Sequence, residues 1–426
     1  MKIAIIGGGL TGLTAAYYLS KKNHQITVFE KEEVSGGLAS GFKMKNWDWY
    51  LDRTYHHIFA NDADILNFSK EIGFNKFFFQ SPETASLFND KTMKQFNNLA
   101  ICPLDTPIDL LAFPYLPFID KFRAGIIIAF LKLSPFLSIY ERQTAEEFLK
   151  KTMGKKVWDV LWKQLFRGKY GNYAGIILAS FIWARIKKRT KSLGYPNGGF
   201  QTFVNYLVKK LISSKVKMLT GCEIKEIRKR GKKYLINNQI FDAVISTLPT
   251  PILVNISQKV FLKNYLDRLS KIKYLHSLTL ILETNKPFLD KTYWLNISTP
   301  NIPIMGIVQH TNFIDKKHYG NKHVVYATWY LNDKSSLWNM DEKQVLKFVI
   351  KNLKLIKNLK FKIKNYYLFK SKFAQPIFDK EFVKNKPDFI TPEKNFFIAN
   401  LDMTYPYDRG TNYAVKLGKE VSKLVR

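Results

Sequence analysis

Cysteine is scarce in this 426-residue sequence, which contains only Cys102 and Cys222. Two cysteines cannot build a disulfide framework or a zinc site held by thiolates, which favours a reducing, cytoplasmic environment. The first residues lack the basic region, apolar run and small-residue cleavage site of a secretory signal, so we expect none. Glycine and proline are also modest, at 22 and 16 residues, and this predicts a globular chain without a disordered tail.

Acidic residues are half as frequent as basic ones. The 34 Asp and Glu face 67 Lys and Arg, for a formal net charge of +33. Such an excess predicts attraction to an anion, whether nucleic acid, acidic lipid or a phosphorylated substrate. The lysines are scattered along the chain, and no zinc-finger, RRM or helix-turn-helix pattern is present. A generally solvated basic surface is therefore favoured, and we expect no specific nucleic-acid partner.

The sequence also lacks a clean apolar run of ~18 to 20 residues, the length needed to span a bilayer. Its most apolar stretch, residues 107–140, is interrupted by Asp120, Lys121, Arg123 and several prolines. Two interpretations remain open. Buried helices covering a substrate tunnel are favoured, and the alternative is a peripheral contact with the inner membrane surface, which would suit a lipid-like substrate.

The first thirty residues carry the strongest motif. A short apolar run at 3–6 predicts a buried strand, residues 10–22 have helical spacing, and a second strand is expected at 25–29. The turn between the first strand and the helix contains Gly7, Gly9 and Gly12, spaced as in a dinucleotide-binding turn, and Glu30 follows the second strand. This pattern predicts a diphosphate at the helix N-terminus and a ribose at Glu30. Leu10, Thr11 and Lys31 are expected in the same site.

The stretch after Glu30, "KEEVSGGLAS", adds a second glycine turn at Gly36 and Gly37. A glutamate followed by this turn resembles the flavoprotein superfamily that contains amine oxidases, protoporphyrinogen oxidases and carotenoid desaturases. In that superfamily the pattern implies FAD and not NAD. Leu38 stands where the family usually has an arginine, and we expect it beside the cofactor.

The resemblance extends along the chain. "GYPNGGFQTFVNYLVKKLISSKVKMLTGCEIKEI" resembles the middle FAD segment, with a strand ending near Glu226 and with Ile224 at the adenine, and "FDAVISTLPTPIL" follows it as in the family. Near the C-terminus, Asp402 stands where the family's Gly-Asp contacts the ribityl chain of FAD. The resemblance implies an α/β fold in which a Rossmann-like FAD-binding domain (1–80, 192–262 and 388–426) carries an inserted α+β substrate domain. The inserted pieces are 81–191, mainly helical after Ala145, and 263–387, a sheet plus helix.

Candidate catalytic residues lie in two segments expected to reach the flavin. Arg53, His56 and His57 follow the second glycine turn, and a neutral histidine suits proton exchange while an arginine suits an anion. Arg409 and Asn412 lie at the start of the last helix, whose N-terminus favours negative charge. An alternative is that Arg409 forms a local ion pair with Asp408.

Lys169 is a further candidate, in the segment "LFRGKYGNYAG". It can meet a substrate anion or an edge of the flavin, or it can be one of the many surface lysines. With so many lysines in the chain, the surface interpretation is favoured.

These observations predict an FAD-dependent oxidoreductase of the oxidase or desaturase type. It would oxidise a hydrophobic or anionic small molecule, lipid-like or phosphorylated, by hydride transfer to flavin. "YHHIF" and "YPNGGFQTF" also resemble loops of UDP-galactopyranose mutase, with His56 in the position of a proline. That resemblance implies an alternative in which reduced flavin attacks a sugar's anomeric carbon without net redox change. The sequence carries no signal of oligomeric state.

Overall fold

The structure is a computed structural model that describes residues 1–90, 98–359 and 361–425. The expected segments 81–191, 263–387 and 388–426 therefore each include residues outside the described part, at 91–97, 360 and 426.

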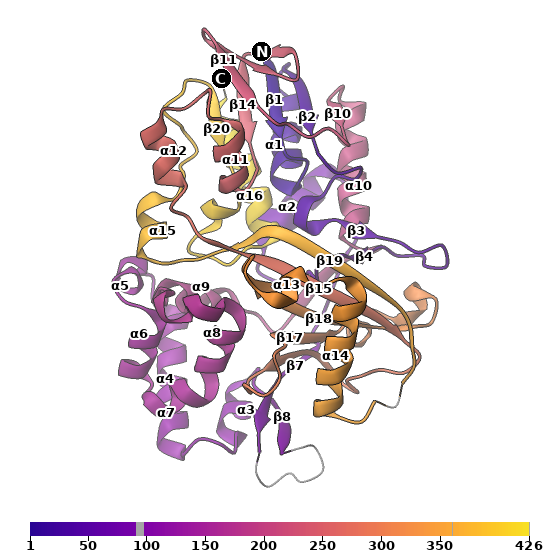
Figure 1. The fold of residues 1–426 in the computed structure, drawn as a ribbon, viewed down its shortest axis with the longest axis vertical. Helices are drawn as coiled ribbons and strands as arrows, with labels where there is room; N and C mark the ends of the chain where they lie inside the picture. Colours follow the sequence, from indigo (N-terminus) through magenta and orange to yellow (C-terminus); the bar gives the residue numbers. More distant parts are fainter. Residues whose placement is uncertain (91–97, 360, 426) are drawn as a thin grey trace.

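A five-stranded parallel sheet occupies the upper half of the molecule in Figure 1. Its strands are drawn from three separate parts of the chain, in the order β10-β2-β1-β14-β20. Their bounds are β1 Lys2–Ile6, β2 Gln25–Phe29, β10 Lys217–Leu219, β14 Ala243–Ser246 and β20 Phe396–Ile398. β1, β2 and β14 follow the apolar runs seen in the sequence, because a parallel sheet covered on both faces buries every side chain.

Helices cover one face of this sheet, and a smaller sheet covers the other. Ile3 and Ile5 of β1 pack with the helical side, while Ala4 and Ile6 pack with the opposite side. The helices are α1 Leu10–Ser20, α10 Phe200–Ser213 and α16 Thr411–Leu424. The opposite layer comprises β11 Ile227–Arg230, β12 Lys233–Ile236, β13 Gln239–Phe241, α11 Thr250–Ile256 and α12 Lys263–Leu269.

A seven-stranded mixed sheet forms the second region, with strand order β19-β15-β18-β17-β16-β7-β8. Its bounds are β7 Glu83–Asn89, β8 Leu99–Pro103, β15 Tyr274–Thr284, β16 Thr292–Ile297, β17 Gly306–Gln309, β18 His323–Leu331 and β19 Ile363–Pro376. Helix α14, Glu342–Ile356, packs its apolar residues on one face of this sheet. The strands and the helix expected between 263 and 387 are therefore present.

The third region is a helical cluster at the lower left of Figure 1. It comprises α3 Pro107–Ala112, α4 Phe118–Leu133, α5 Leu137–Glu141, α6 Ala145–Thr152, α7 Lys155–Val157, α8 Lys163–Tyr170 and α9 Ala179–Lys188. Helix α6 begins at the expected residue, with a capping box between Thr144 and Glu147. The stretch 107–140 is also helical, but many of its apolar side chains are exposed, so the interpretation of fully buried helices is wrong.

Two small sheets and several helices connect these regions. β3 Gly41–Phe42 pairs with β4 Leu51–Asp52, and β9 Leu193–Pro196 lies between β5 Ile58–Phe59 and β6 Phe77–Gln80. The connecting helices are α2 Ala63–Ile72, α13 Ser336–Asn339 and α15 Lys380–Asn385. One sequence expectation is corrected here: the strand expected to end near Glu226 ends at Leu219, because the chain then turns at Gly221 (φ +63°). The α/β fold class with a Rossmann-like region and an α+β region is confirmed.

Candidate active site

A cavity of about 800 Å³ is lined by residues of the parallel-sheet region, the seven-stranded sheet and the helical cluster. Three of its lining residues come directly after strands of this sheet: Gly7 follows β1, Glu30 follows β2 and Thr247 follows β14. The cavity therefore begins at the carboxyl edge of the parallel sheet, where doubly wound folds bind their ligands.

The two glycine turns meet at this edge. Gly7 has φ +112°, and a Cβ on Gly12 would lie 2.1 Å from the Gly7 carbonyl oxygen, so both positions require glycine. Gly36 N donates to Gly8 O at 2.8 Å, and a Cβ on Gly37 would lie 3.3 Å from Gly9 Cα. The backbones of the two turns are thus in contact, and Gly7, Gly9, Gly36 and Gly37 line the cavity.

Glu30 bonds the first glycine turn and the start of the segment after β2 through its carboxylate. Its Oε2 accepts from Gly8 N at 2.8 Å and its Oε1 accepts from Glu32 N at 3.0 Å, although the residue is only 7% exposed. A buried carboxylate that accepts backbone hydrogen bonds also keeps lone pairs for a ligand hydroxyl. Lys31, Leu38 and Ile224, all expected at the cofactor, line the cavity beside it.

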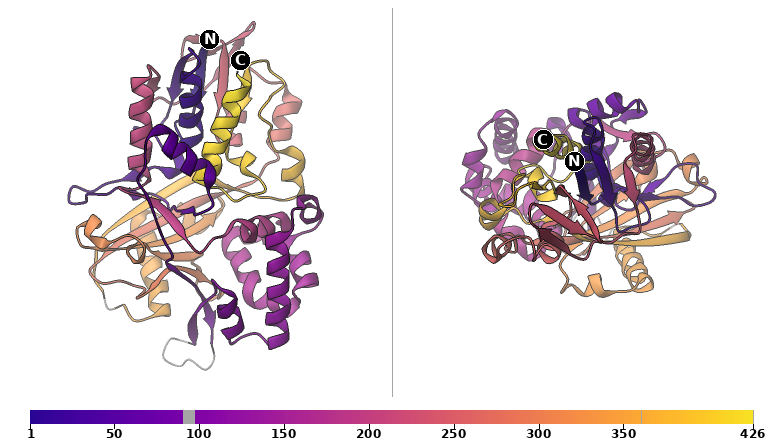
Figure 2. Two further views of the ribbon diagram at one scale, coloured as in Figure 1. Left: turned by 180° about the vertical axis from the view of Figure 1, so that it is seen from behind. Right: turned by 90° about the horizontal axis from the view of Figure 1, so that it is seen from above.

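Helices α1 and α16 both direct their N-termini at the cavity. Their N-caps, Gly9 and Gly410, provide no side-chain hydrogen bond, and neither first turn contains an acidic residue. The first backbone N–H groups of a helix lack intrahelical partners and carry partial positive charge, so two anion-binding helix ends converge here. The helices lie side by side, as Figure 2 shows, since a Cβ on Gly418 would lie only 2.4 Å from Thr11 O. Leu10 and Thr11 line the cavity from α1.

Arg53, His56 and His57 reach the cavity from the segment around β4 and β5. Burial, followed by the charge of Arg409, lowers the pKa of His56 to about 3, and burial with Arg189 and Arg185 lowers that of His57 to about 4. Both rings are therefore neutral at pH 7. His56 Nδ1 and Arg53 Nε are buried and have no hydrogen-bond partner within the described part of the chain.

Lys169 lies in the cavity wall, so the favoured surface interpretation is wrong. Its side chain is 14% exposed, and Nζ forms an ion pair with Asp408 Oδ2 at 2.5 Å. Burial lowers the pKa of Lys169 to about 8, with Asp408 opposing this shift and Arg185 adding to it. The charge of Lys169 therefore changes within about one pH unit of neutrality.

Arg409 also lines the cavity, but its partner differs from the one considered in the sequence. Its guanidinium donates through Nε to Tyr330 OH at 3.1 Å and through a second nitrogen to the same oxygen. Asp408 instead pairs with Lys169 and, at 3.5 Å, with Arg185. The local Asp408–Arg409 ion pair is therefore absent, because the two side chains face different elements.

Asn412 and Asp402 were both expected at the cofactor. Asn412 lines the cavity, while its Oδ1 accepts from Ile65 N at 3.0 Å and ties α16 to α2. Asp402 is not part of the cavity lining, and its carboxylate accepts from Thr250 Oγ1 at 2.5 Å and from Tyr274 OH. Its neighbour Leu401 lines the cavity instead.

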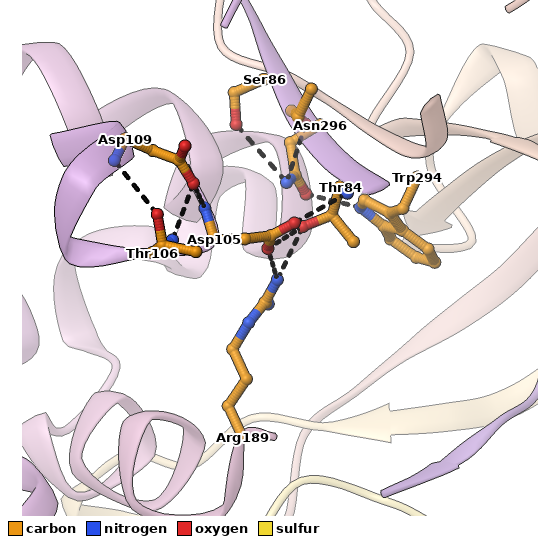
Figure 3. Close-up of polar contacts among 9 residues, drawn as sticks. Thr84, Ser86, Asp105, Thr106, Asp109, Arg189, Trp294 and Asn296 are labelled. Carbon is orange, nitrogen blue, oxygen red and sulfur yellow. Dashed lines mark hydrogen bonds and ion pairs between the residues drawn. The ribbon is translucent and has the colours of Figure 1, made fainter. Parts of the chain in front are cut away.

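A basic rim borders the cavity where α9 ends. Arg185, Lys188 and Arg189 line it at positions i, i+3 and i+4, which lie on one side of a helix. Figure 3 shows Arg189 extended toward Asp105, with which it pairs at 2.8 Å, and toward Thr84. The rim is therefore held by α9 and by the chain just before α3.

Most of the expected site residues come together in this one cavity. Gly12 and Asp402 are the two expected residues that do not line it. Gly12 contributes indirectly, because its lack of a side chain allows α1 to pack against the first glycine turn. Sequence reasoning missed Tyr330, Arg185 and Arg189; the helical spacing of the two arginines was a usable signal, whereas nothing local marked Tyr330.

The donors present fit a flavin dinucleotide. Two uncapped helix N-termini, a glycine cradle that a Cβ would fill, and a buried carboxylate at the next strand are the groups that bind a diphosphate and a ribose. The chain matches the family model described as flavin containing amine oxidoreductase over residues 10–399.

The chain belongs to this family. The sequence resemblance predicted this membership. Curated relatives include a 4,4'-diapophytoene desaturase of Staphylococcus haemolyticus, 56% identical over 54 residues, which are 13% of this chain and 11% of that protein. A 15-cis-phytoene desaturase of Synechococcus elongatus is 36% identical over 72 residues, 17% of this chain and 15% of the relative. These alignments span less than a fifth of either relative.

Solved structures share the fold over the whole chain. A protein assigned as a protoporphyrinogen oxidase from Exiguobacterium sp. 255-15 superposes with a TM-score of 0.76 at 16% identity, covering 100% of this chain and 98% of the other. Reduced UDP-galactopyranose mutase has a TM-score of 0.75 at 16% identity, covering 100% and 95%. At such low identity these likenesses establish the fold alone.

Proposed function

We propose that this flavoenzyme uses FAD to oxidise or desaturate an apolar small molecule that carries an anionic group. The observation that carries the proposal is the single cavity joining the glycine turns after β1 and β2 to the Lys169–Asp408 pair and the basic rim. A dinucleotide bound at the turns would leave the Lys169 side of the cavity for the substrate.

The binding residues proposed for FAD follow from their contacts. The N–H groups of Leu10 and Thr11 at the start of α1 would hold the diphosphate, and Glu30 would accept from a ribose hydroxyl. Thr411 and Asn412, at the start of α16, would favour negative charge developing at the redox end. When bound, FAD supplies the two-electron acceptor of the reaction.

Lys169 is the group best suited to hold or move a proton at its Nζ. Its pKa of about 8 lies near the operating pH, where general acid–base groups are most effective. His57 and His56, with pKa values of about 4 and 3, are weak bases at neutral pH and serve as neutral hydrogen-bonding walls. Arg53 and Arg409 also line the cavity and add positive charge to it.

The lining of the Lys169 side indicates the class of substrate. Trp162, Leu165 and Phe181 supply an apolar wall, while Arg185, Lys188 and Arg189 supply cations at the rim. An apolar substrate would bury its body against the wall and place its anionic group at the rim.

The test begins with mass spectrometry of the small molecules released from purified protein, where FAD is expected. The yellow protein is then mixed without oxygen with amines, polyenes and apolar carboxylates or phosphates, and bleaching of the flavin absorption is followed. Bleaching by an anionic apolar compound, reversed by oxygen or a quinone, supports the proposal. Protein that binds no flavin nucleotide, or that bleaches with none of these classes, contradicts it.

The mutase alternative predicts a different outcome in the same apparatus. Its support is the short loop resemblance at residues 55–59 and 195–203 and the shared fold. Turnover of UDP-galactopyranose only by dithionite-reduced protein, with an unchanged flavin spectrum afterwards, would replace the oxidase proposal by the mutase one.

A further inference from the structure

The helical cluster exposes a large apolar surface that the proposed chemistry does not use. Of the 20 exposed large apolar side chains in the described part of the chain, 11 lie between residues 101 and 139. We define the α3–α5 apolar surface by these eleven residues, of which the first lies in β8 and the others within 108–139: Ile101, Ile108, Leu111, Phe118, Ile119, Phe122, Ile126, Phe130, Leu133, Phe136 and Ile139. Isolated exposed apolar residues are ordinary, but so many within one short stretch of chain are typical of an interaction site.

Helix α4 supplies the centre of this surface. At about 100° per residue, its six exposed apolar residues fall within an arc of about 120° that contains no charged or polar side chain. The buried residues Ala124 and Leu131 lie on the opposite side of the helix and pack into the helical core. The helix thus has two apolar sides, one that packs against the core and one that faces outward.

The charge around this surface indicates its partner. Residues 101–191 contain 16 Lys and Arg but seven Asp and Glu, and the whole chain carries +33. Lys121, Arg123 and Lys132 border the apolar arc on α4 itself. An apolar surface ringed by cations fits an anionic bilayer, whereas pairing with a second copy would bring two strongly positive faces together.

The cavity rim adjoins this surface. Lys132 Nζ, near the end of α4, donates to the Arg189 carbonyl oxygen at 2.7 Å. Asp105, which pairs with Arg189, donates its backbone N–H to Asp109 Oδ2 in the first turn of α3 at 2.9 Å, as Figure 3 shows. The basic rim therefore lies directly beside the start of α3 and the end of α4.

We infer that the α3–α5 apolar surface docks the protein on an anionic lipid bilayer, with the cavity rim at the level of the headgroups. No helix in the part of the chain that the structure describes is long and apolar enough to cross a membrane, so the contact is one of partial insertion. If the proposed function holds, an amphiphilic substrate passes from the bilayer into the cavity with its anionic end at the rim.

Vesicle co-sedimentation of the flavin-loaded protein tests this inference. Wild-type protein is expected to sediment with phosphatidylglycerol-containing vesicles and at least about tenfold less with pure phosphatidylcholine, because each basic residue near an anionic surface strengthens the attraction. The variant Phe118→Ser/Leu133→Ser removes two side chains that are 72% and 80% exposed. It is expected to lose at least about tenfold in binding, because the transfer of each apolar side chain from water into lipid favours binding.

The matched control is Leu262→Ser/Ile390→Ser, whose side chains are 76% and 67% exposed but lie outside the α3–α5 apolar surface. It should bind within about twofold of wild type. Equal binding by the two double variants, or equal binding to both kinds of vesicle, overturns the inference. So does a wild-type dimer that binds no vesicles and that Phe118→Ser/Leu133→Ser dissociates, since the partner is then a second copy. Flavin content is measured throughout, so a failure of docking is distinguishable from a failure of the proposed function.

Discussion

The two ends of the cavity are built in different ways. At the parallel sheet, the ligand-facing groups are backbone amides and glycines held within residues 7–37, with Glu30 bonded to the first of the two turns. At the opposite end, the ligand-facing groups are side chains, and the pair at its centre joins Lys169 to Asp408, which are 239 residues apart. The first end is a local motif, and the second exists only once the chain is folded.

This difference has an energetic consequence. A backbone cradle depends on close approach, so an added methyl group disrupts it as a whole. A set of charged side chains shares its interactions among several partners, and the loss of one member is partly compensated by solvent and neighbours. We therefore expect substitutions at the sheet end to have larger effects than those at the Lys169 end.

The largest effect is expected at Gly12. In Gly12→Ala the new Cβ would lie 2.1 Å from the Gly7 carbonyl oxygen, so the strand and helix must separate. We expect the free energy of flavin binding to weaken by about 3 kcal/mol, which is more than a hundredfold in affinity, as measured by flavin fluorescence titration. Gly125→Ala is the control, because a Cβ there meets nothing within 4 Å in helix α4. Similar flavin affinity in both variants would remove the distinction between the two ends.

Glu30→Gln should rank second. The amide keeps one acceptor, so one of the two bonds, to Gly8 N or to Glu32 N, is lost together with the charge that would grip a ribose hydroxyl. Losing a buried hydrogen bond to a charged group costs about 2 kcal/mol, which predicts roughly thirtyfold weaker binding of flavin. The nearby Glu33→Gln changes the same charge on an exposed side chain outside the cavity lining and should be near wild type in the same titration. Equal weakening by the two variants would show that only the net charge matters here.

The same contrast explains how much of the site the sequence predicted. The glycine turns and Glu30 could be predicted because a strand, a turn and a helix close together in the sequence fix where these residues lie relative to one another. Lys169 was assigned to the surface because nothing in its own segment distinguishes it from the other lysines; its burial depends on Asp408, which a distant loop supplies. Asp402 lies outside the cavity lining and is bonded to Thr250 and Tyr274 from distant parts of the chain, so its role in FAD binding stays a prediction.

Fold prediction followed the same rule. β1, β2, α1 and α14 were recognised from their own periodicity. Burial was favoured for the apolar residues of α3 to α5 because an apolar stretch is usually covered by other parts of the protein, and the sequence of the stretch does not show whether it is. Which side of α4 faces the core depends on the helices that pack against it, and that information lies outside the stretch itself.

Asp408→Asn tests the Lys169 end of the cavity through the pH at which Lys169 titrates. Asp408 raises the pKa of Lys169 while burial lowers it, so removing the carboxylate should move the lysine's titration from about 8 to lower pH, by at least about one unit. The inflection in a pH titration of the flavin absorption should shift accordingly, with flavin affinity little changed. Asp159→Asn is the control, since it removes the partner of Lys163 on the surface of the helical cluster. An unchanged inflection in Asp408→Asn would mean that Lys169 does not titrate near the flavin.

Arg189→Gln should have the smallest effect. Its ion pair with Asp105 is 41% exposed on the arginine side, and exposed pairs contribute at most about 1 kcal/mol. We expect about threefold weaker binding of decyl phosphate, an apolar chain with an anionic head, measured by its perturbation of the flavin spectrum. Lys163→Gln, outside the cavity lining, should bind this probe as the wild type does. A loss above about fiftyfold in Arg189→Gln would mean that the rim holds its ligand as rigidly as the glycine turns hold theirs, and the contrast between the two ends would fail.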